Sequence, residues 1–193
     1  MALRRYLNII IVSIVLILSA SVSSAFDDGF DSAKKIEGKY IVAYYPTDAD
    51  PAELLQTLDM RSSDKILAGE RSQSKKTYDE ELAQALDTLF IQVSDILEMH
   101  LYSLKTVVKV CQDAAQLTDI YKRMFNADLG GRRSFYVHSF GTIYISKESF
   151  MREILGHEMS HAIIGHYFVI PTPVKIQEVL SMYVEYNLRR TAS

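Results

Sequence analysis

The chain has 193 residues, with 24 acidic against 21 basic side chains and a formal net charge of −3. This length is sufficient for one domain with a buried core. The acidic balance, without any basic run, argues against a nucleic-acid partner, and the single cysteine, Cys111, excludes an intramolecular disulfide.

The first 25 residues have the pattern of a secretory signal peptide. Arg4 and Arg5 precede an apolar run over residues 7–20, and small residues follow at positions 23–25. Because this order is typical of exported proteins, we expect a periplasmic or secreted chain that begins at Phe26. The alternative is an uncleaved anchor over residues 7–25 in the inner membrane, although the run is short for a full span. We expect no other membrane contact.

The residues after this segment predict a short lead and then one domain. The polar residues 26–38 favour a flexible lead, and residues 39–193 are expected to form a single domain. Its first strand is predicted over residues 40–45, which are rich in aromatic and β-branched side chains and end at Pro46. The polar residues 61–76 predict a surface loop, with a weak strand at Ile66 and Leu67 as the alternative.

A long amphipathic helix is predicted after this loop. Thr77 and Glu80 have the spacing of a capping box, and apolar side chains then recur on one stripe up to Leu97. A second strand is predicted over residues 106–111, and a second helix begins after Asp113. Together these elements predict an α+β fold in which a long helix packs on a small mixed sheet.

The last third of the chain predicts a hairpin and two helices. Residues 134–145 alternate as two short strands around a turn. Ser146 is placed to cap the next helix, and Gly165 is placed to end it. The last helix restarts at Pro173, since proline is favoured in the first helical turn.

The helix after the hairpin contains the motif His157-Glu158-x-x-His161. Residues four apart lie one above the other on a helix, so the two imidazoles can share a metal ion and Glu158 can reach a water on it. These three are the only ionisable side chains between residues 154 and 164, where burial without partners would be costly. A divalent cation would remove that cost. The alternative is a partly exposed helix whose histidines form ordinary hydrogen bonds.

A catalytic zinc site takes a third protein ligand and keeps one position for water. His166 follows His161 by five residues, about 140° round the helix, so it could ligate only if the helix ended first. Glu178 lies in the next helix, and two helices with a short connection pack antiparallel, which could return its carboxylate to the histidines. The sequence therefore favours Glu178, with an exposed helix carboxylate as the alternative.

These two segments resemble the gluzincin branch of the zincin metallopeptidases, in particular small bacterial members with a minimal peptidase MA-like domain. The resemblance implies a zincin-like α+β fold in which the C-terminal helix carries the third ligand. It implies one Zn²⁺ per chain, bound by His157, His161 and Glu178. It also implies that Glu158 is the general base in the hydrolysis of peptides or unfolded protein.

The resemblance further implies a strand at the edge of the cleft that pairs with an extended substrate. The candidate is the strand just before the motif helix, which consists of Thr142, Ile143, Tyr144 and Ile145.

Two further roles have candidates outside the motif. Family members often stabilise the oxyanion with a tyrosine or histidine, for which the candidates are Tyr183, Tyr186 and His166. Some members place an aspartate four residues after the ligand glutamate, as a partner for a zinc-bound histidine. That position holds Met182 here, and Glu185 is the substitute candidate.

The sequence therefore predicts an exported zinc metallopeptidase. The alternative function is a zinc-stabilised, catalytically silent binding or scaffold domain of the same fold. Glu158 argues against it, because a purely structural zinc site has a fourth protein ligand and needs no base. A third interpretation is a helical adaptor with a fortuitous motif and no metal.

Overall fold

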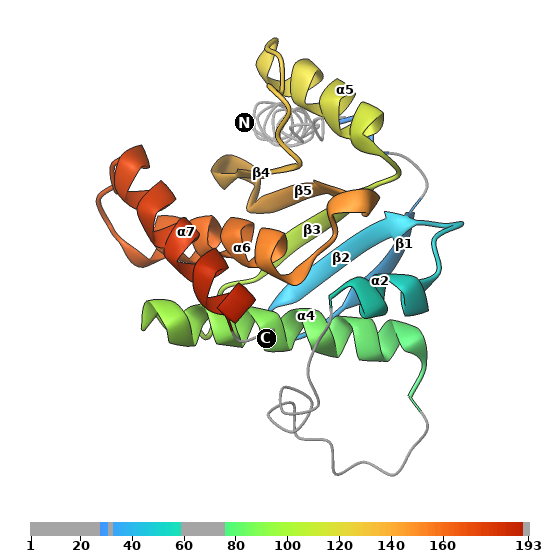
Figure 1. Cartoon of the computed structure of the whole chain (residues 1–193), viewed down its shortest axis with the longest axis horizontal. Coiled ribbons are helices and arrows are strands. Elements are labelled where there is room, and N and C mark those ends of the chain that lie inside the picture. The colour runs from blue at the N-terminus through green and yellow to red at the C-terminus, as the bar shows by residue number, and fades with distance from the viewer. Residues whose placement is uncertain (1–27, 31–32, 59–75, 191–193) are drawn as a thin grey trace, which may run out of the picture.

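A five-stranded mixed sheet with the strand order β1-β2-β3-β5-β4 forms the centre of the protein (Figure 1). The computed structural model describes residues 28–30, 33–58 and 76–190. The strands are β1 (Ala33–Glu37), β2 (Ile41–Pro46), β3 (Thr106–Cys111), β4 (Ser134–Val137) and β5 (Thr142–Ser146). The three inner strands are parallel, and β1 and β4 pair antiparallel at the two edges.

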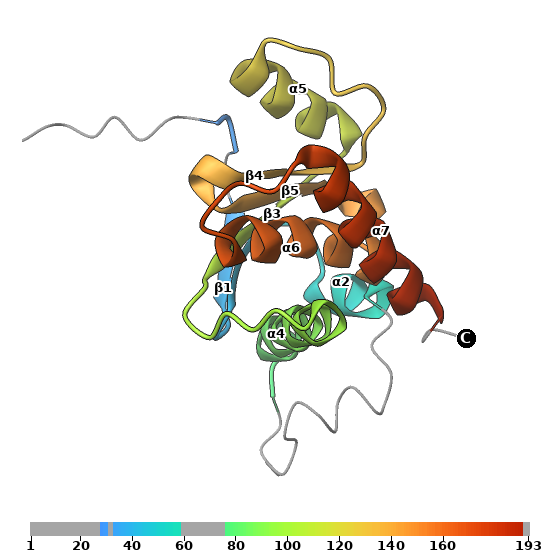
Figure 2. The same cartoon turned by 90° about the vertical axis from the view of Figure 1, so that its left-hand side faces the viewer.

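Helices cover both faces of this sheet (Figure 2). The helices are α2 (Pro51–Thr57), α4 (Tyr78–Leu97), α5 (Ala114–Phe125), α6 (Arg152–Tyr167) and α7 (Val174–Arg190). On one face α4 and α6 pack against the strands, with α7 against α6, and α5 covers the other face. The α+β class, the mixed sheet and the long packing helix are therefore as the sequence predicts.

The core explains why the inner strands are rich in Val, Ile and Tyr. Parallel strands with helices on both faces bury both sets of side chains, and every residue of β5 is buried. The larger cluster lies among the sheet, α4 and α6, and the smaller one lies against α5 and includes the fully buried Cys111. The predicted capping box of α4 is also present, because Thr77 Oγ accepts from the Glu80 amide and the Glu80 carboxylate accepts from the Thr77 amide.

The prediction of a flexible lead over residues 26–38 is wrong for its described part. Ala33–Glu37 forms β1, which pairs with β2 in a register from Ala33–Pro46 to Glu37–Val42. Upstream, the Asp28 carboxylate accepts hydrogen bonds from Lys109 and from the Tyr144 hydroxyl. Backbone pairing and this polar contact hold the segment on the domain, which its polar composition does not reveal.

Two predicted N-terminal features and one loop lie outside the described residues. These are the signal peptide or anchor, the start at Phe26 and nearly all of the loop over residues 61–76. Within the described ranges, no helix has the length and apolar character needed to cross a bilayer.

Both predicted ends of the motif helix are wrong. Strand β5 extends through Ser146, a 3₁₀ turn (η2, Lys147–Ser149) follows, and α6 begins only at Arg152. The intervening turn buries Phe150, which a helix starting at Ser146 would have to place differently. At the other end α6 continues past Gly165 to Tyr167. A Cβ at Gly165 would lie 2.8 Å from His138 Nδ1, so this glycine permits a close approach and does not end the helix.

Candidate metal centre

Small residues bring α6 and α7 close together. A Cβ added to Gly156 of α6 would lie only 2.2 Å from Leu188 Cδ1 of α7. One turn further along α6, Ser160 Oγ shares a hydrogen bond of 2.7 Å with Ser181 Oγ of α7. Because the two backbones approach so closely, glutamates of α7 reach across to the histidines of α6.

The structure brings together the three side chains predicted to bind metal. His157, His161 and Glu178 each offer one ligand atom, and these atoms lie within 4.8 Å of one another. The two Nε2 atoms are 3.3 Å apart, and the Glu178 oxygens lie 3.7 Å from His157 Nε2 and 3.6 Å from His161 Nε2. Two ligands at the usual bond lengths of a tetrahedral zinc lie about 3.4 Å apart. The three atoms therefore fit around a cation of this size.

The protonation of His161 also suits a cation. Burial lowers the pKa of His161, and the neighbouring His157 lowers it further. A lowered pKa favours the neutral imidazole, which is the form that binds a metal. Glu178, about half exposed, supplies negative charge at the open side of the pair.

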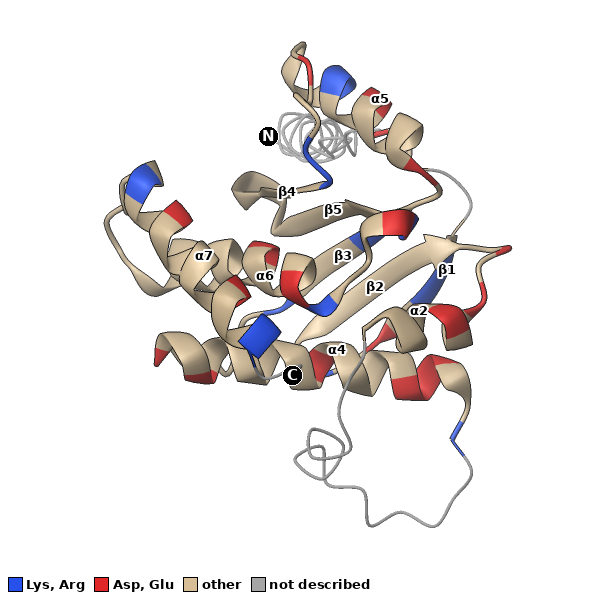
Figure 3. Cartoon of the chain, in the orientation of Figure 1, with Lys and Arg blue, Asp and Glu red and all other residues tan. Residues whose placement is uncertain are grey.

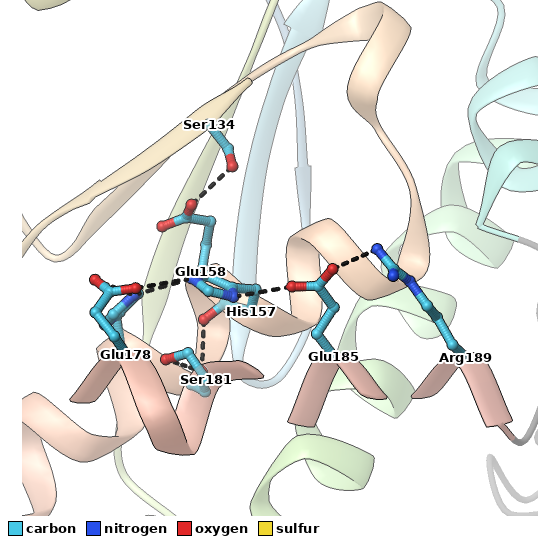
Figure 4. Close-up of polar contacts among 9 residues, drawn as sticks. Ser134, His157, Glu158, Glu178, Ser181, Glu185 and Arg189 are labelled. Atoms are coloured by element: carbon cyan, nitrogen blue, oxygen red, sulfur yellow. Dashed lines mark hydrogen bonds and ion pairs between the residues drawn. The ribbon is translucent and has the colours of Figure 1, made fainter. Parts of the chain in front are cut away.

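Glu158 lies beside these three side chains and is buried (Figure 4). Its Oε1 accepts a hydrogen bond of 2.7 Å from Ser134 Oγ, at the start of β4. Burial raises the pKa of Glu158, and the bond from Ser134 partly opposes this rise. A carboxylate with a raised pKa and a fixed orientation suits proton transfer near neutral pH. Ser134 was not a candidate from the sequence, since nothing local links it to a residue 24 positions later.

Glu185, the substitute candidate, contacts His157 at Nδ1, the nitrogen that does not face the other candidate metal ligands. Its Oε2 lies 3.2 Å from His157 Nδ1, and its Oε1 accepts from Arg189 of the next turn. A carboxylate on Nδ1 holds the ring in the tautomer whose Nε2 is free to ligate. Met182, at the position where some gluzincins have aspartate, is more than half exposed instead.

The site opens into a cleft with a volume of about 880 Å³, within the usual range for ligand sites. Its walls are β4 and the residues before it, α6, the α6–α7 connection and α7. Strand β5 does not form the edge, because it lies between β3 and β4 in the sheet. The predicted substrate strand over residues 142–145 is therefore wrong, and β4 (Ser134–Val137) is the outermost strand beside the cleft.

None of the predicted oxyanion candidates lines this cleft. Tyr183 and Tyr186 are more than half exposed on α7, and the His166 ring donates to the Ala162 carbonyl and packs against His138. The cleft wall instead contains Arg132 and Tyr136, from the loop before β4 and from β4 itself.

These two residues were missed because their hairpin is distant in sequence from the motif. The positive charge of Arg132 favours the ionised form of Glu158, so the guanidinium acts on the site electrostatically. Burial raises the pKa of Tyr136 to about 12, so its hydroxyl keeps its proton; this oxygen is buried and has no hydrogen-bond partner among the described residues.

Comparison with known proteins gives no relative for this chain: no model of a protein family, no curated protein and no solved structure matches it significantly. The functional conclusion therefore depends on the residues and on their geometry.

Proposed function

We propose that this chain is an exported zinc metallopeptidase with a zincin-like fold that hydrolyses peptides or unfolded protein. The observation that carries this proposal is the convergence of His157, His161 and Glu178 beside a buried, oriented Glu158 in one cleft. Three ligands with a separate carboxylate are the composition of a catalytic zinc site, whereas a structural site closes with a fourth ligand. The N-terminal sequence pattern supports export.

When bound, zinc would polarise the scissile carbonyl and lower the pKa of a water in the open position. His157, His161 and Glu178 would hold the ion, and Glu185 would orient the His157 ring through Nδ1. Glu158 would take the proton of the attacking water and pass it to the leaving amine. Ser134 would fix the orientation of the Glu158 carboxylate during both transfers. It donates to Oε1 only, so Oε2 would remain available to carry the proton.

An extended peptide would lie along β4. This strand would pair with the substrate in place of residues 142–145, for which the sequence predicted that role. β4 is the outer strand on this side of the sheet, and its residues Ser134 to Tyr136 line the cleft next to Glu158. Backbone pairing with such an edge positions a peptide without requiring particular side chains. A substrate bound in this way would need to be unfolded locally.

The test is the cleavage of a mixed library of unstructured peptides by the zinc-loaded protein. Glu158→Gln should bind zinc with an unchanged stoichiometry and give no products. Glu153→Gln, which removes a carboxylate from the same helix outside the cleft wall, should cleave like the wild type. Products from wild type and Glu153→Gln alone would support the proposal. Zinc binding without any products would favour the catalytically silent domain, and absence of zinc binding would refute both.

A further inference from the structure

An extensive apolar surface lies on the α6–α7 connection and on the outer side of α7. It consists of Tyr167, Phe168, Val169, Ile170, Val174, Ile176, Val179, Met182, Tyr183 and Tyr186, all of them large apolar or aromatic side chains that are exposed. We call this set the α7 surface. Val169 is 101% exposed and Ile170 is 80% exposed, so most of the surface of these two side chains faces solvent. Apolar side chains that gather on the surface of a soluble protein often mark an interaction site.

The α7 surface is additional to the face with which α7 packs on the core. The buried residues of this helix are Ser181, Val184 and Leu188. Ile176, Val179, Tyr183 and Tyr186 follow one another at steps of three, four and three, so they share a second stripe of the helix. Helix α7 is therefore apolar on two sides, and the fold covers only one of them.

The charges of α7 are separated between these sides. Glu178 and Glu185 contact the metal-binding histidines. The outer side carries basic charge only: Lys175 lies one turn before Val179, and Arg190 lies two turns after Tyr183. The connection over residues 168–173 contains no Lys, Arg, Asp or Glu, as its tan ribbon in Figure 3 shows. The α7 surface is thus apolar, rich in tyrosine, and flanked by positive charges.

We propose that the α7 surface docks on a bilayer containing anionic lipids. Val169 and Ile170 would enter the acyl region, the tyrosines would lie at headgroup level, and Lys175 and Arg190 would meet the anionic headgroups. A bilayer is favoured over a second copy of the chain because Val169 and Ile170 are so exposed and because Lys175 and Arg190, on the outer side of α7, are basic, while the half-exposed Glu178 contacts the histidines. The N-terminal apolar run, which we expect to direct export, would also bring the chain to a membrane.

The docked orientation has a consequence for access to the cleft. Phe168 and Val169 belong both to the α7 surface and to the cleft wall. One end of the cleft would therefore open beside the bilayer. The proposal itself requires neither zinc nor hydrolysis, so its test is independent of the proposed function.

The first experiment uses the absence of tryptophan from this chain. Ile170→Trp places a single reporter on the α6–α7 connection, and Tyr102→Trp places one at an exposed site after α4 as the matched control. Each full-length variant is mixed with vesicles of phosphatidylethanolamine and phosphatidylglycerol. We expect Ile170→Trp emission to shift to shorter wavelength and to be quenched by lipids spin-labelled near the headgroup, while Tyr102→Trp emission stays unchanged.

The second experiment measures partitioning into the same vesicles by flotation. Removing one positive charge near an anionic surface weakens binding about fivefold, so Lys175→Ala and Arg190→Ala should each have this effect. Lys122→Ala, an exposed lysine of α5, should have none. If neither the emission wavelength nor the quenching of Ile170→Trp changes when vesicles are added, the proposal is wrong. A blue shift that grows with protein concentration without lipid would instead identify a second copy as the occupant, and would also overturn it.

Discussion

Glu185→Ala should weaken zinc binding about 10- to 100-fold, although Glu185 is not one of the three proposed ligands. The reason is its contact with His157, whose Nδ1 lies 3.2 Å from Glu185 Oε2. Without this acceptor the ring can rotate or change tautomer, and Nε2 is then no longer held toward the other ligands. The range corresponds to about 1.4–2.7 kcal/mol. We expect a value near its lower end, because the Glu185 side chain is 25% exposed and water can replace part of the contact.

The assay is competition for zinc with a chromogenic chelator at constant pH. Glu148→Ala is the matched control, because it removes an exposed carboxylate from η2 and changes the net charge equally. Arg189→Ala tests the ion pair separately: it removes the other partner of Glu185 and should change zinc affinity by much less. If Glu185→Ala binds zinc within about twofold of Glu148→Ala, the contact with His157 does not position the ligand, and this reasoning is wrong.

Three further predictions concern packing, acid stability and the general base. Gly156→Ala should lower the free energy of unfolding by about 1–3 kcal/mol in urea denaturation, because its Cβ would displace Leu188; an unchanged midpoint would show that α7 shifts freely. Burial opposes ionisation of Asp28, but hydrogen bonds from three neighbours outweigh it and lower its pKa below 3.8. Its charge therefore stabilises the fold above the unfolded pKa of about 3.9, and this contribution is lost as the pH falls through the lower folded pKa. Asp28→Asn should lose less stability than the wild type between pH 7 and pH 3, and equal losses would argue against the assignment. Ser134→Ala should lower kcat about tenfold at unchanged zinc affinity. It should also move the acid limb of the pH–rate profile to higher pH, because the hydrogen bond that it removes lowers the pKa of Glu158. An acid limb at unchanged pH would show that Ser134 does not affect the proposed base.

Most elements, and the proximity of the candidate metal ligands, could be predicted because most of their signals are local. The capping box of α4 and the aromatic and β-branched composition of β2 and β3 depend on residues a few positions apart. The His157–His161 pair likewise follows from a spacing of four on one helix. Glu178 needed one step more, a return of the chain through a short connection, and the structure places it beside both histidines.

The substrate strand could not be predicted because its place depends on a pairing distant in sequence. The hairpin over residues 134–145 shows from sequence that β4 and β5 are neighbours. It does not show which of them pairs with β3, and that choice decides which strand lies at the edge. In the structure β3 pairs with β5 from Val107–Thr142 to Cys111–Ser146, so β4 is left outside. The fully buried sequence of β5 is consistent with an inner strand.

The ends of the motif helix were mispredicted because serine and glycine, which favour helix ends, also occur in other structural roles. Serine before an acidic residue favours an N-cap, but Ser146 instead completes the pairing of β5 with β3. Glycine after a helical pattern favours a C-cap, but Gly165 has an ordinary helical backbone and is needed for the approach of His138. Both residues respond to tertiary neighbours that the local pattern does not contain.

The carboxylate partner of His157 on α7 shows why the fixed spacing of a known motif can mislead in a chain that only resembles it. Four residues after Glu178, where the resemblance expects an aspartate, Met182 turns outward and is exposed. Glu185 follows Glu178 by seven residues, which is two turns and about 10.5 Å along the helix, and it returns to nearly the same side. The two long carboxylates converge from these positions on opposite nitrogens of one ring, His157 Nε2 and Nδ1. An aspartate has a shorter side chain, so its backbone would need to lie closer to His157. The length of the glutamate side chain and the close packing of α7 at Gly156 together allow a carboxylate seven residues after Glu178 to reach the ring.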